Sequence, residues 1–314
     1  MMPWVLSGLG LVILLLAGDA LVKGAVNLAL RLGIPALIVS LTIVAFGTSA
    51  PELLISIKAI HDGAPGLALG NVVGSNTANI LLVLGIPALL ATMHTSQCDT
   101  RKSYNFMIAA SLLFIGLAFR GVFDWLAGLV LLGALAYVLF DQLRDAREHR
   151  RCGADGPEEP EGADPSMPSW QIGIFLVLGL IGLPVGAGLL VDNATLIAQA
   201  YGVSDTVIGL TMVAIGTSLP ELATTVMAAL RRQADVVLGS VIGSNMFNLL
   251  AIIGIASLVG PISVDPEFLK FDLWVMLGAS LLLIPFVFLK KDITRNWGVM
   301  LSALYALYLV LVLV

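Results

Sequence analysis

Long apolar runs alternate with short polar segments along almost the whole chain. Most of these runs reach about 20 residues, the length that an α-helix needs to cross the hydrocarbon core of a bilayer. A backbone in lipid must satisfy its own hydrogen bonds, so the runs must be helices or the strands of a closed barrel. The short alternating strands of a barrel do not occur in this sequence, and the pattern predicts an all-α membrane protein. Ten transmembrane helices are expected, at 4–30, 35–60, 66–92, 103–119, 122–143, 170–200, 205–230, 236–260, 270–289 and 295–313.

The composition of the chain agrees with this prediction. Hydrophobic residues make up 58% of the 314 positions and charged residues only 12%, whereas soluble domains carry about 25% charged residues. The two cysteines, Cys98 and Cys152, indicate no disulfide framework, and the three histidines show no metal-ligand spacing. The N-terminal residues lack the basic stretch and cleavage site of a signal peptide, so 4–30 is interpreted as the first span.

A polar segment at about 144–169 separates the fifth and sixth runs. It begins RDAREHRR and continues GADGPEEPEGADPSMP. This composition is typical of a solvated, partly disordered linker, and it divides the chain into the halves 1–143 and 170–314. A regulatory ion-binding loop is the alternative, but the acids lack the spacing of an EF-hand.

The basic residues predict the orientation, because cytoplasmic loops of membrane proteins are enriched in lysine and arginine. If the linker is cytoplasmic, only Lys58, Arg120 and Lys270 of the 16 basic residues lie near outer ends of spans. We therefore expect a multi-pass protein of the cell membrane with both termini outside. The other basic residues then lie near inner ends: Lys23, Arg31, Arg101, Lys102, Arg144, Arg147, Arg150, Arg151, Arg231, Arg232, Lys290, Lys291 and Arg295.

The two halves contain a sequence repeat. VAFGTSAPEL returns as VAIGTSLPEL, and ALGNVVGSNTANILLVLG returns as VLGSVIGSNMFNLLAIIG. Both copies are offset by 169 positions without a gap, so the spacing between the two blocks is duplicated as well. The repeated motif covers 44–85 in the first half and 213–254 in the second.

The number of spans in each half predicts how the repeats are arranged. Each half holds five spans, an odd number, so the second half must insert upside down relative to the first. Inverted repeats are a signature of transporters that bind their substrate near the bilayer midplane, where the repeats meet. The sequence thus predicts two inverted five-helix repeats.

Two glutamates inside predicted spans, Glu52 and Glu221, carry the chemistry. A charge at mid-bilayer costs about 3 kcal/mol on insertion scales, so equivalent acids in both halves favour a cation site over protonated or capping carboxyls. Polar and small residues share one helical face with each glutamate. That face holds Ala45, Thr48, Ser49 and Glu52 in the first half, and Ala214, Thr217, Ser218 and Glu221 in the second.

Further oxygen ligands are predicted nearby. Proline has no N–H, so Pro51 and Pro220 leave the carbonyls of Gly47 and Gly216 without their usual helical donor. Carboxylates, hydroxyls, amide oxygens and carbonyls together are the ligands of a hard cation such as Ca²⁺. The hydroxyl and amide candidates on the neighbouring spans are Ser75, Asn79, Ser244 and Asn248.

Three further charged residues lie inside the first and sixth spans. Asp19 and Lys23 are one helical turn apart, a spacing at which they can pair with each other. Asp192 occupies the position equivalent to Lys23 in the second half. All three are interpreted as structural or hinge residues.

The GTSxPE and GSNxxN motifs in both halves resemble the two α-repeats of the sodium/calcium exchanger family, within the cation/calcium exchanger superfamily. The resemblance covers essentially the whole chain. It implies an antiporter, with Glu52 and Glu221 as central ligands shared by Ca²⁺ and Na⁺. It further implies main-chain carbonyls at Thr48, Thr217, Ala45 and Ala214, hydroxyls at Ser49, Ser218, Ser75 and Ser244, and Asn79 lining the centre.

Asn248 departs from the family pattern, because many members have aspartate at this position. The change removes a third acid, which bears on the ion stoichiometry and on the identity of the driving ion. The linker is also too short for the regulatory calcium-binding domains of animal exchangers, so the chain resembles the small prokaryotic type.

Three alternatives compete with a sodium-driven exchanger. A proton-driven calcium exchanger of the same fold is the nearest, although such relatives usually carry other acidic motifs. A channel normally needs a continuous pore and several subunits, which the inverted repeat disfavours. An intramembrane protease would need paired aspartates or a Ser/His pair, so no enzyme is expected. The expected partners are Ca²⁺, Na⁺ and lipid, with no cofactor and no nucleic acid, and the oligomeric state is left open.

Overall fold

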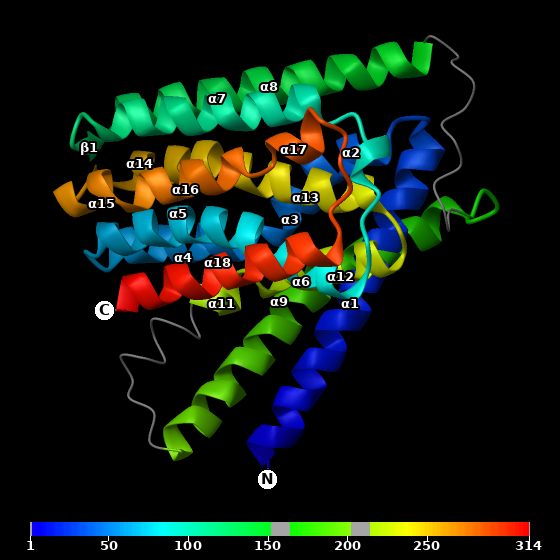
Figure 1. Cartoon of the computed structure of the whole chain (residues 1–314), viewed down its shortest axis with the longest axis horizontal. Helices are drawn as coiled ribbons and strands as arrows, with labels where there is room; N and C mark the ends of the chain where they lie inside the picture. The colour runs from blue at the N-terminus through cyan, green and yellow to red at the C-terminus, as the bar shows by residue number, and fades with distance from the viewer. Residues whose placement is uncertain (1, 152–163, 202–213, 314) are drawn as a thin grey trace.

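A computed structural model describes residues 2–151, 164–201 and 214–313. In these ranges the chain is almost entirely helical (Figure 1). The first-half helices are α1 (Met2–Leu32), α2 (Ala36–Val39), η1 (Ser40–Val44), α3 (Ala45–Thr48), α4 (Ala50–His61), α5 (Pro65–Leu81), α6 (Gly85–Leu90), η2 (Thr95–Gln97), α7 (Arg101–Ala118) and α8 (Trp125–Arg151). The second-half helices are α9 (Ser169–Ala200), α11 (Ala214–Thr217), α12 (Leu219–Leu230), α13 (Ala234–Phe247), η4 (Asn248–Ile252), α14 (Ile253–Val259), α15 (Pro266–Lys270), α16 (Asp272–Leu281), α17 (Ile284–Val287) and α18 (Arg295–Leu313).

Within the described ranges, six helices are long and apolar enough to cross a membrane. The segment from α2 to α4 becomes a seventh if its two parts, bent by 42°, are counted as one span. These seven coincide with seven of the ten expected runs. The other three runs fall on α7, on α11 and α12 together with residues 205–213, which lie outside the described residues, and on α18.

The helices that carry the repeated motif are packed in the centre of the molecule. Every residue of the most apolar stretch of the span Ala234–Val259 is buried, compared with about a fifth of the corresponding stretch in α9. Large apolar side chains of α1, α8 and α9, among them Leu16, Phe140 and Ile181, are exposed, as expected for helices that face lipid. Figure 1 shows α8 beside α7 on one side of the bundle, whereas one end of α1 and one end of α9 project below it.

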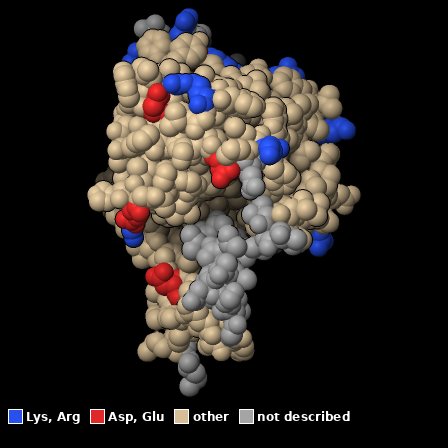
Figure 2. Space-filling model, turned by 90° about the vertical axis from the view of Figure 1, so that its left-hand side faces the viewer, with Lys and Arg blue, Asp and Glu red and all other residues tan. Residues whose placement is uncertain are grey.

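The end of the molecule that carries β1 has few charges. Figure 2 shows isolated lysine, arginine, aspartate and glutamate side chains on a mostly uncharged surface. At this end Arg120 pairs with Asp124, whose carboxylate also accepts the N–H of Ala127 at the start of α8. The bond from Ala127 to Asp124 caps the N-terminus of α8.

Two small backbone pairings join loops of the first half to loops of the second. At one end, β1 (Val122–Phe123) pairs antiparallel with β2 (Ile262–Ser263). Elsewhere, Met93 and Ile293 exchange two backbone hydrogen bonds of 3.0 and 3.1 Å. Both pairings connect segments that lie far apart in the sequence.

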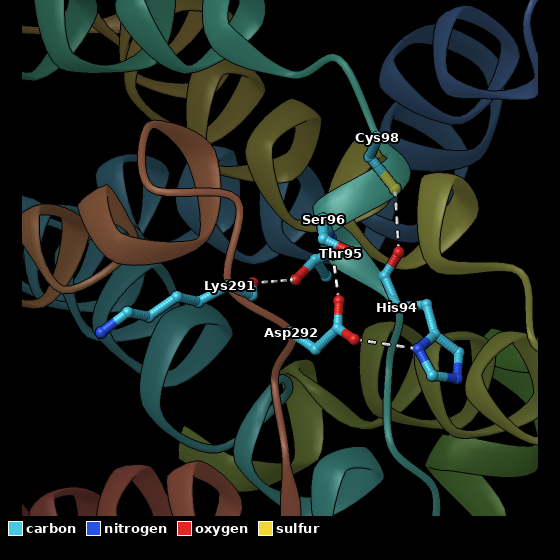
Figure 3. A network of polar contacts seen from close by, with 6 residues as sticks. All are labelled: His94, Thr95, Ser96, Cys98, Lys291 and Asp292. Carbon is cyan, nitrogen blue, oxygen red and sulfur yellow. Dashed lines mark hydrogen bonds and ion pairs between the residues drawn. The ribbon is translucent and has the colours of Figure 1, made fainter.

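Side chains reinforce the Met93–Ile293 pairing (Figure 3). The Asp292 carboxylate accepts the backbone N–H of Ser96 at 3.0 Å and lies 3.0 Å from His94 Nδ1. The Thr95 hydroxyl donates to the Lys291 carbonyl at 2.8 Å. The loop before α7 is thereby tied to the loop before α18.

One expectation is refined and one needs correction. α8 continues to Arg151, so the first residues of the expected linker 144–169 extend the helix of the fifth expected span. Residues 152–163 of that linker lie outside the described residues. Asp19 does not pair with Lys23: its carboxylate binds Arg231 at the end of α12, and the Lys23 ammonium lies over the Phe175 ring at 5.3 Å. The spacing of residues along one helix carries no information about partners on neighbouring helices.

Candidate cation-binding site

Two helix breaks, related by the repeat, place the glutamates. The chain leaves helical geometry at Ser49, with φ −85° and ψ 3°, and at Ser218, with φ −85° and ψ 1°. A new helix begins directly after each serine, with proline in its first turn. Glu52 and Glu221 therefore each lie in the first turn of a helix, where the positive end of the helix dipole favours a carboxylate.

Both carboxylates are buried. Glu52 and Glu221 are each 1% exposed. Oε1 of Glu221 accepts the Ser49 hydroxyl of the other half at 3.3 Å. Oε2 of each glutamate has no hydrogen-bond partner among the described residues. Burying a charged carboxylate is costly unless a cation or a proton compensates its charge.

Residues of the first break also contact the second half. The Thr48 hydroxyl lies 3.5 Å from the Ser244 hydroxyl and donates to the Ala45 carbonyl at 3.3 Å. Thr48 and Ser244 are 1% and 0% exposed. The structure therefore brings together predicted ligands that are almost 200 positions apart in the sequence.

The two predicted asparagines lie where their helices deviate from α geometry. The N–H of Val83 reaches back five residues to the Ala78 carbonyl beside Asn79, and Asn248 begins the π-helix η4. Such π-type widening is common at functional sites. The amide nitrogens of Asn79 and Asn248 donate to other asparagines at 3.0 Å, whereas neither Oδ1 has a partner in the described part of the chain.

Most of the remaining predicted ligands are also buried. Ser75, Thr217 and Ser218 are buried, and the Ser218 hydroxyl has no hydrogen-bond partner within the described ranges. Ala214 is the first described residue of α11. The side-chain oxygens without a described partner in this region belong to Glu52, Ser218, Glu221, Asn79 and Asn248.

The site has two acids and many neutral oxygens. No group of three or more His, Cys, Asp or Glu side chains that could hold a metal occurs in the described ranges. Hard cations bind carboxylate, hydroxyl, amide and carbonyl oxygens, whereas soft metals prefer thiolate or imidazole. The arrangement is therefore suited to an alkali or alkaline-earth cation.

Three residues beside the ligands were not predicted from the sequence. Asn76 and Asn245 bond to each other and to the predicted asparagines, and Asn71 donates to the Glu52 carbonyl and the Ser56 hydroxyl. Asn76 and Asn245 stand at identical positions of the repeated GSN motif. Their repetition inside a buried helix was a signal that could have identified them.

A known protein family matches most of the chain. A model of the family described as "sodium/calcium exchanger protein" matches residues 2–143 and 172–314. The chain belongs to this family. It is therefore a cation/calcium exchanger of the transporter class and not an enzyme, and it is a multi-pass membrane protein.

Several relatives match over most of their length. The putative antiporter CaxA of Alkalimonas amylolytica is 39% identical, over 88% of this chain and 86% of that protein. The sodium/calcium exchanger MaX1 of Methanosarcina acetivorans is 36% identical over 96% of both chains. A solved structure of the sodium-calcium exchanger NCX_Mj, soaked with Na⁺ and Sr²⁺, matches 99% of this chain and 98% of its own, with a TM-score of 0.81 and 32% identity.

Proposed function

We propose that this exchanger is a secondary active antiporter that exchanges Na⁺ for Ca²⁺ by alternating access, with the ions bound between its two halves. The observation that carries the proposal is the pair of buried glutamates, one from each half, each with an Oε2 that lacks a described partner. Two carboxylates balance the charge of one Ca²⁺, and a bound cation satisfies oxygens that are otherwise costly to bury.

The proposed ligands surround this pair. Glu52 and Glu221 are the central ligands for Ca²⁺ and Na⁺. The surrounding oxygens come from main-chain carbonyls, hydroxyls and side-chain amides of both halves. They belong to Ala45, Thr48, Ser49, Ser75, Asn79, Ala214, Thr217, Ser218, Ser244 and Asn248.

The fold proposed for transport is ten spans in two inverted five-helix repeats. The nearly identical backbone at Ser49 and Ser218 supports it. The loop pairings support it as well, because Met93, which pairs with Ile293, is 169 positions before Ile262, which pairs with Phe123. Equivalent segments thus make equivalent contacts with the opposite half, as expected for two repeats related by a two-fold axis.

The domain division and the orientation are part of the proposal. The first repeat is 1–143, the linker 144–169 is cytoplasmic, and the second repeat is 170–314, with both termini outside. The two parts of the family match, which end and resume close to these boundaries, support the division. The relative YrbG of Escherichia coli, 34% identical, is called an inner membrane protein, which supports a location in the cell membrane.

Sodium is the proposed driving ion, and a proton is the alternative. GTSxPE in both halves and the similarity to MaX1 favour sodium. The Ca²⁺/H⁺ antiporter ChaA of Bacillus subtilis also matches, at 24% identity over 82% of this chain. Asn248, in place of an acid, leaves two carboxylates at the site.

A flux measurement distinguishes the two driving ions. Purified protein is reconstituted into Na⁺-loaded liposomes and diluted into Na⁺-free medium with ⁴⁵Ca²⁺. We expect uptake to require the outward Na⁺ gradient and to disappear when Na⁺ is equal on both sides. Equal uptake driven by a pH gradient in the complete absence of Na⁺ would refute sodium coupling and favour the proton-driven exchanger.

A further inference from the structure

Four asparagines of α5, α13 and η4 form a buried hydrogen-bond network. They are Asn76 and Asn79 of the first half and Asn245 and Asn248 of the second, and each is at most 1% exposed. Each residue has its equivalent 169 positions away, so the network repeats the symmetry of the sequence. Its outer pair, Asn79 and Asn248, belongs to the proposed ligands, whereas its inner pair does not.

The inner asparagines are fixed in orientation by the backbone. The Asn76 amide nitrogen donates to the Asn245 main-chain carbonyl at 3.2 Å, and the Asn245 amide nitrogen donates to the Asn76 main-chain carbonyl at 3.4 Å. A main-chain carbonyl only accepts hydrogen bonds, so each amide must turn its NH₂ group toward it. Asn76 also directs this nitrogen to the Met276 sulfur at 3.8 Å, a second acceptor.

The orientation of the inner asparagines determines the orientation of the outer asparagines. With its nitrogen engaged, Asn76 presents Oδ1 to Asn248, which donates to it at 3.0 Å. Asn245 likewise presents Oδ1 to Asn79, which also donates at 3.0 Å. Each outer asparagine thus uses its NH₂ group within the network, and its own Oδ1 is left without a partner among the described residues.

We infer that Asn76 and Asn245 are positioning residues that force Asn248 and Asn79, respectively, to present oxygen rather than nitrogen to the transported cation. This inference rests on the proposed function, since it concerns the same ions. An amide that is free to rotate presents NH₂ as readily as oxygen, and NH₂ cannot bind a cation. The network removes that choice.

The same geometry accounts for asparagine at position 248. The group that faces Asn76 Oδ1 must be a donor, and an ionised aspartate has only acceptors. Asparagine supplies the donor and a neutral ligand oxygen together. The net negative charge of the site then comes from Glu52 and Glu221 alone.

Crossed double-mutant cycles test the inference. The readout is the half-saturating Ca²⁺ concentration for thermal stabilisation of the protein in detergent, which needs neither transport nor Na⁺. Asn76→Ala should raise this concentration about tenfold, the usual effect of one hydrogen bond in a buried site. In an Asn248→Ala background, where no amide remains to be oriented, Asn76→Ala should add almost nothing.

The matched control uses Asn79, the ligand that Asn245 orients. In an Asn79→Ala background, Asn76→Ala should keep its full tenfold effect. Asn245→Ala should have no effect in the Asn79→Ala background and its full effect in the Asn248→Ala background. Asn76→Leu, which keeps the number and branching of the side-chain heavy atoms and leaves no cavity, should behave as Asn76→Ala and guards against a cavity effect. A merely structural role predicts the same effect of Asn76→Ala in every background, and that result would overturn the inference.

The double-mutant cycles and the flux experiment test separate claims. If the wild type shows no Na⁺-driven Ca²⁺ uptake but the crossed pattern is observed, the proposed exchange is refuted and the positioning role stands. If uptake is normal but the effect of Asn76→Ala is the same in every background, the positioning role is refuted and the proposed exchange stands.

Discussion

At the scale of single residues, some features of the site were predictable from the sequence and others were not. Glu52 and Glu221 were predictable because an acid within an apolar run is costly to insert, and its repetition in both halves favours a binding role. The contact of Thr48 with Ser244 and the bonds of Asn76 with Asn245 were not predictable. They depend on the register between packed helices, which no pattern along one helix contains.

Asn248 stands where the resemblance to the exchanger family leads us to expect aspartate in many members, and its substitution is informative. An aspartate there can donate to Asn76 Oδ1 only when protonated. Asn248→Asp should therefore change the Na⁺ dependence of ⁴⁵Ca²⁺ uptake more than the apparent Ca²⁺ affinity, with a several-fold larger change at high pH than at low pH. A Na⁺ dependence identical to that of the wild type at every pH would show that the substitution is neutral.

At the scale of elements, apolar run length predicted where helices occur but not where they break. Seven of the ten expected runs coincide with spans that are long and apolar enough, counting the bent segment from α2 to α4. Pro51 and Pro220 indicated disturbed helices, yet the complete interruption at Ser49 and Ser218 is stabilised by tertiary contacts such as the bond from Ser49 to Glu221. The π-helix at Asn248 had no signal in residue type.

The loop contact around Asp292 makes a prediction about pH. Partial burial acts to raise the pKa of Asp292, but hydrogen bonds from Ser96 and His94 outweigh it and hold the pKa below its ordinary value. A lowered folded-state pKa means stability that is present above the unfolded value, about 3.9, and is lost as the pH falls through the folded value. The loop pairing therefore weakens in acid.

Asp292→Asn should lower the melting temperature in detergent by about 2 °C near neutral pH. The difference from the wild type should shrink as the pH falls below about 4, because the wild type then loses the same contribution. Asp99→Asn, which changes an exposed acid of the same region, serves as the control and should have little effect. A difference that stays constant down to about pH 3 would contradict the assigned bonds.

At the scale of the whole molecule, the orientation proposed from the basic residues can be tested by labelling. In a background with Cys98 and Cys152 replaced by serine, Ser166→Cys should be protected from an impermeant thiol reagent in intact cells. Ser166 and His61 are both exposed in the structure, so protection of the former reflects the membrane. His61→Cys, on the proposed outer side, should be labelled readily, and the reverse pattern would overturn the orientation.

The central claim is that one cation site is shared equally by both halves, and ⁴⁵Ca²⁺ flux in liposomes tests it through the paired glutamates. Glutamine keeps the size and one oxygen of glutamate but removes one negative charge from a site that must compensate a divalent ion. Glu52→Gln and Glu221→Gln should each abolish Na⁺-driven uptake, and the two losses should be similar in size. Both variants should remain monodisperse in size-exclusion chromatography. Asp62→Asn, an exposed acid after α4, should retain uptake. Near-normal uptake by either folded glutamine variant would contradict the account.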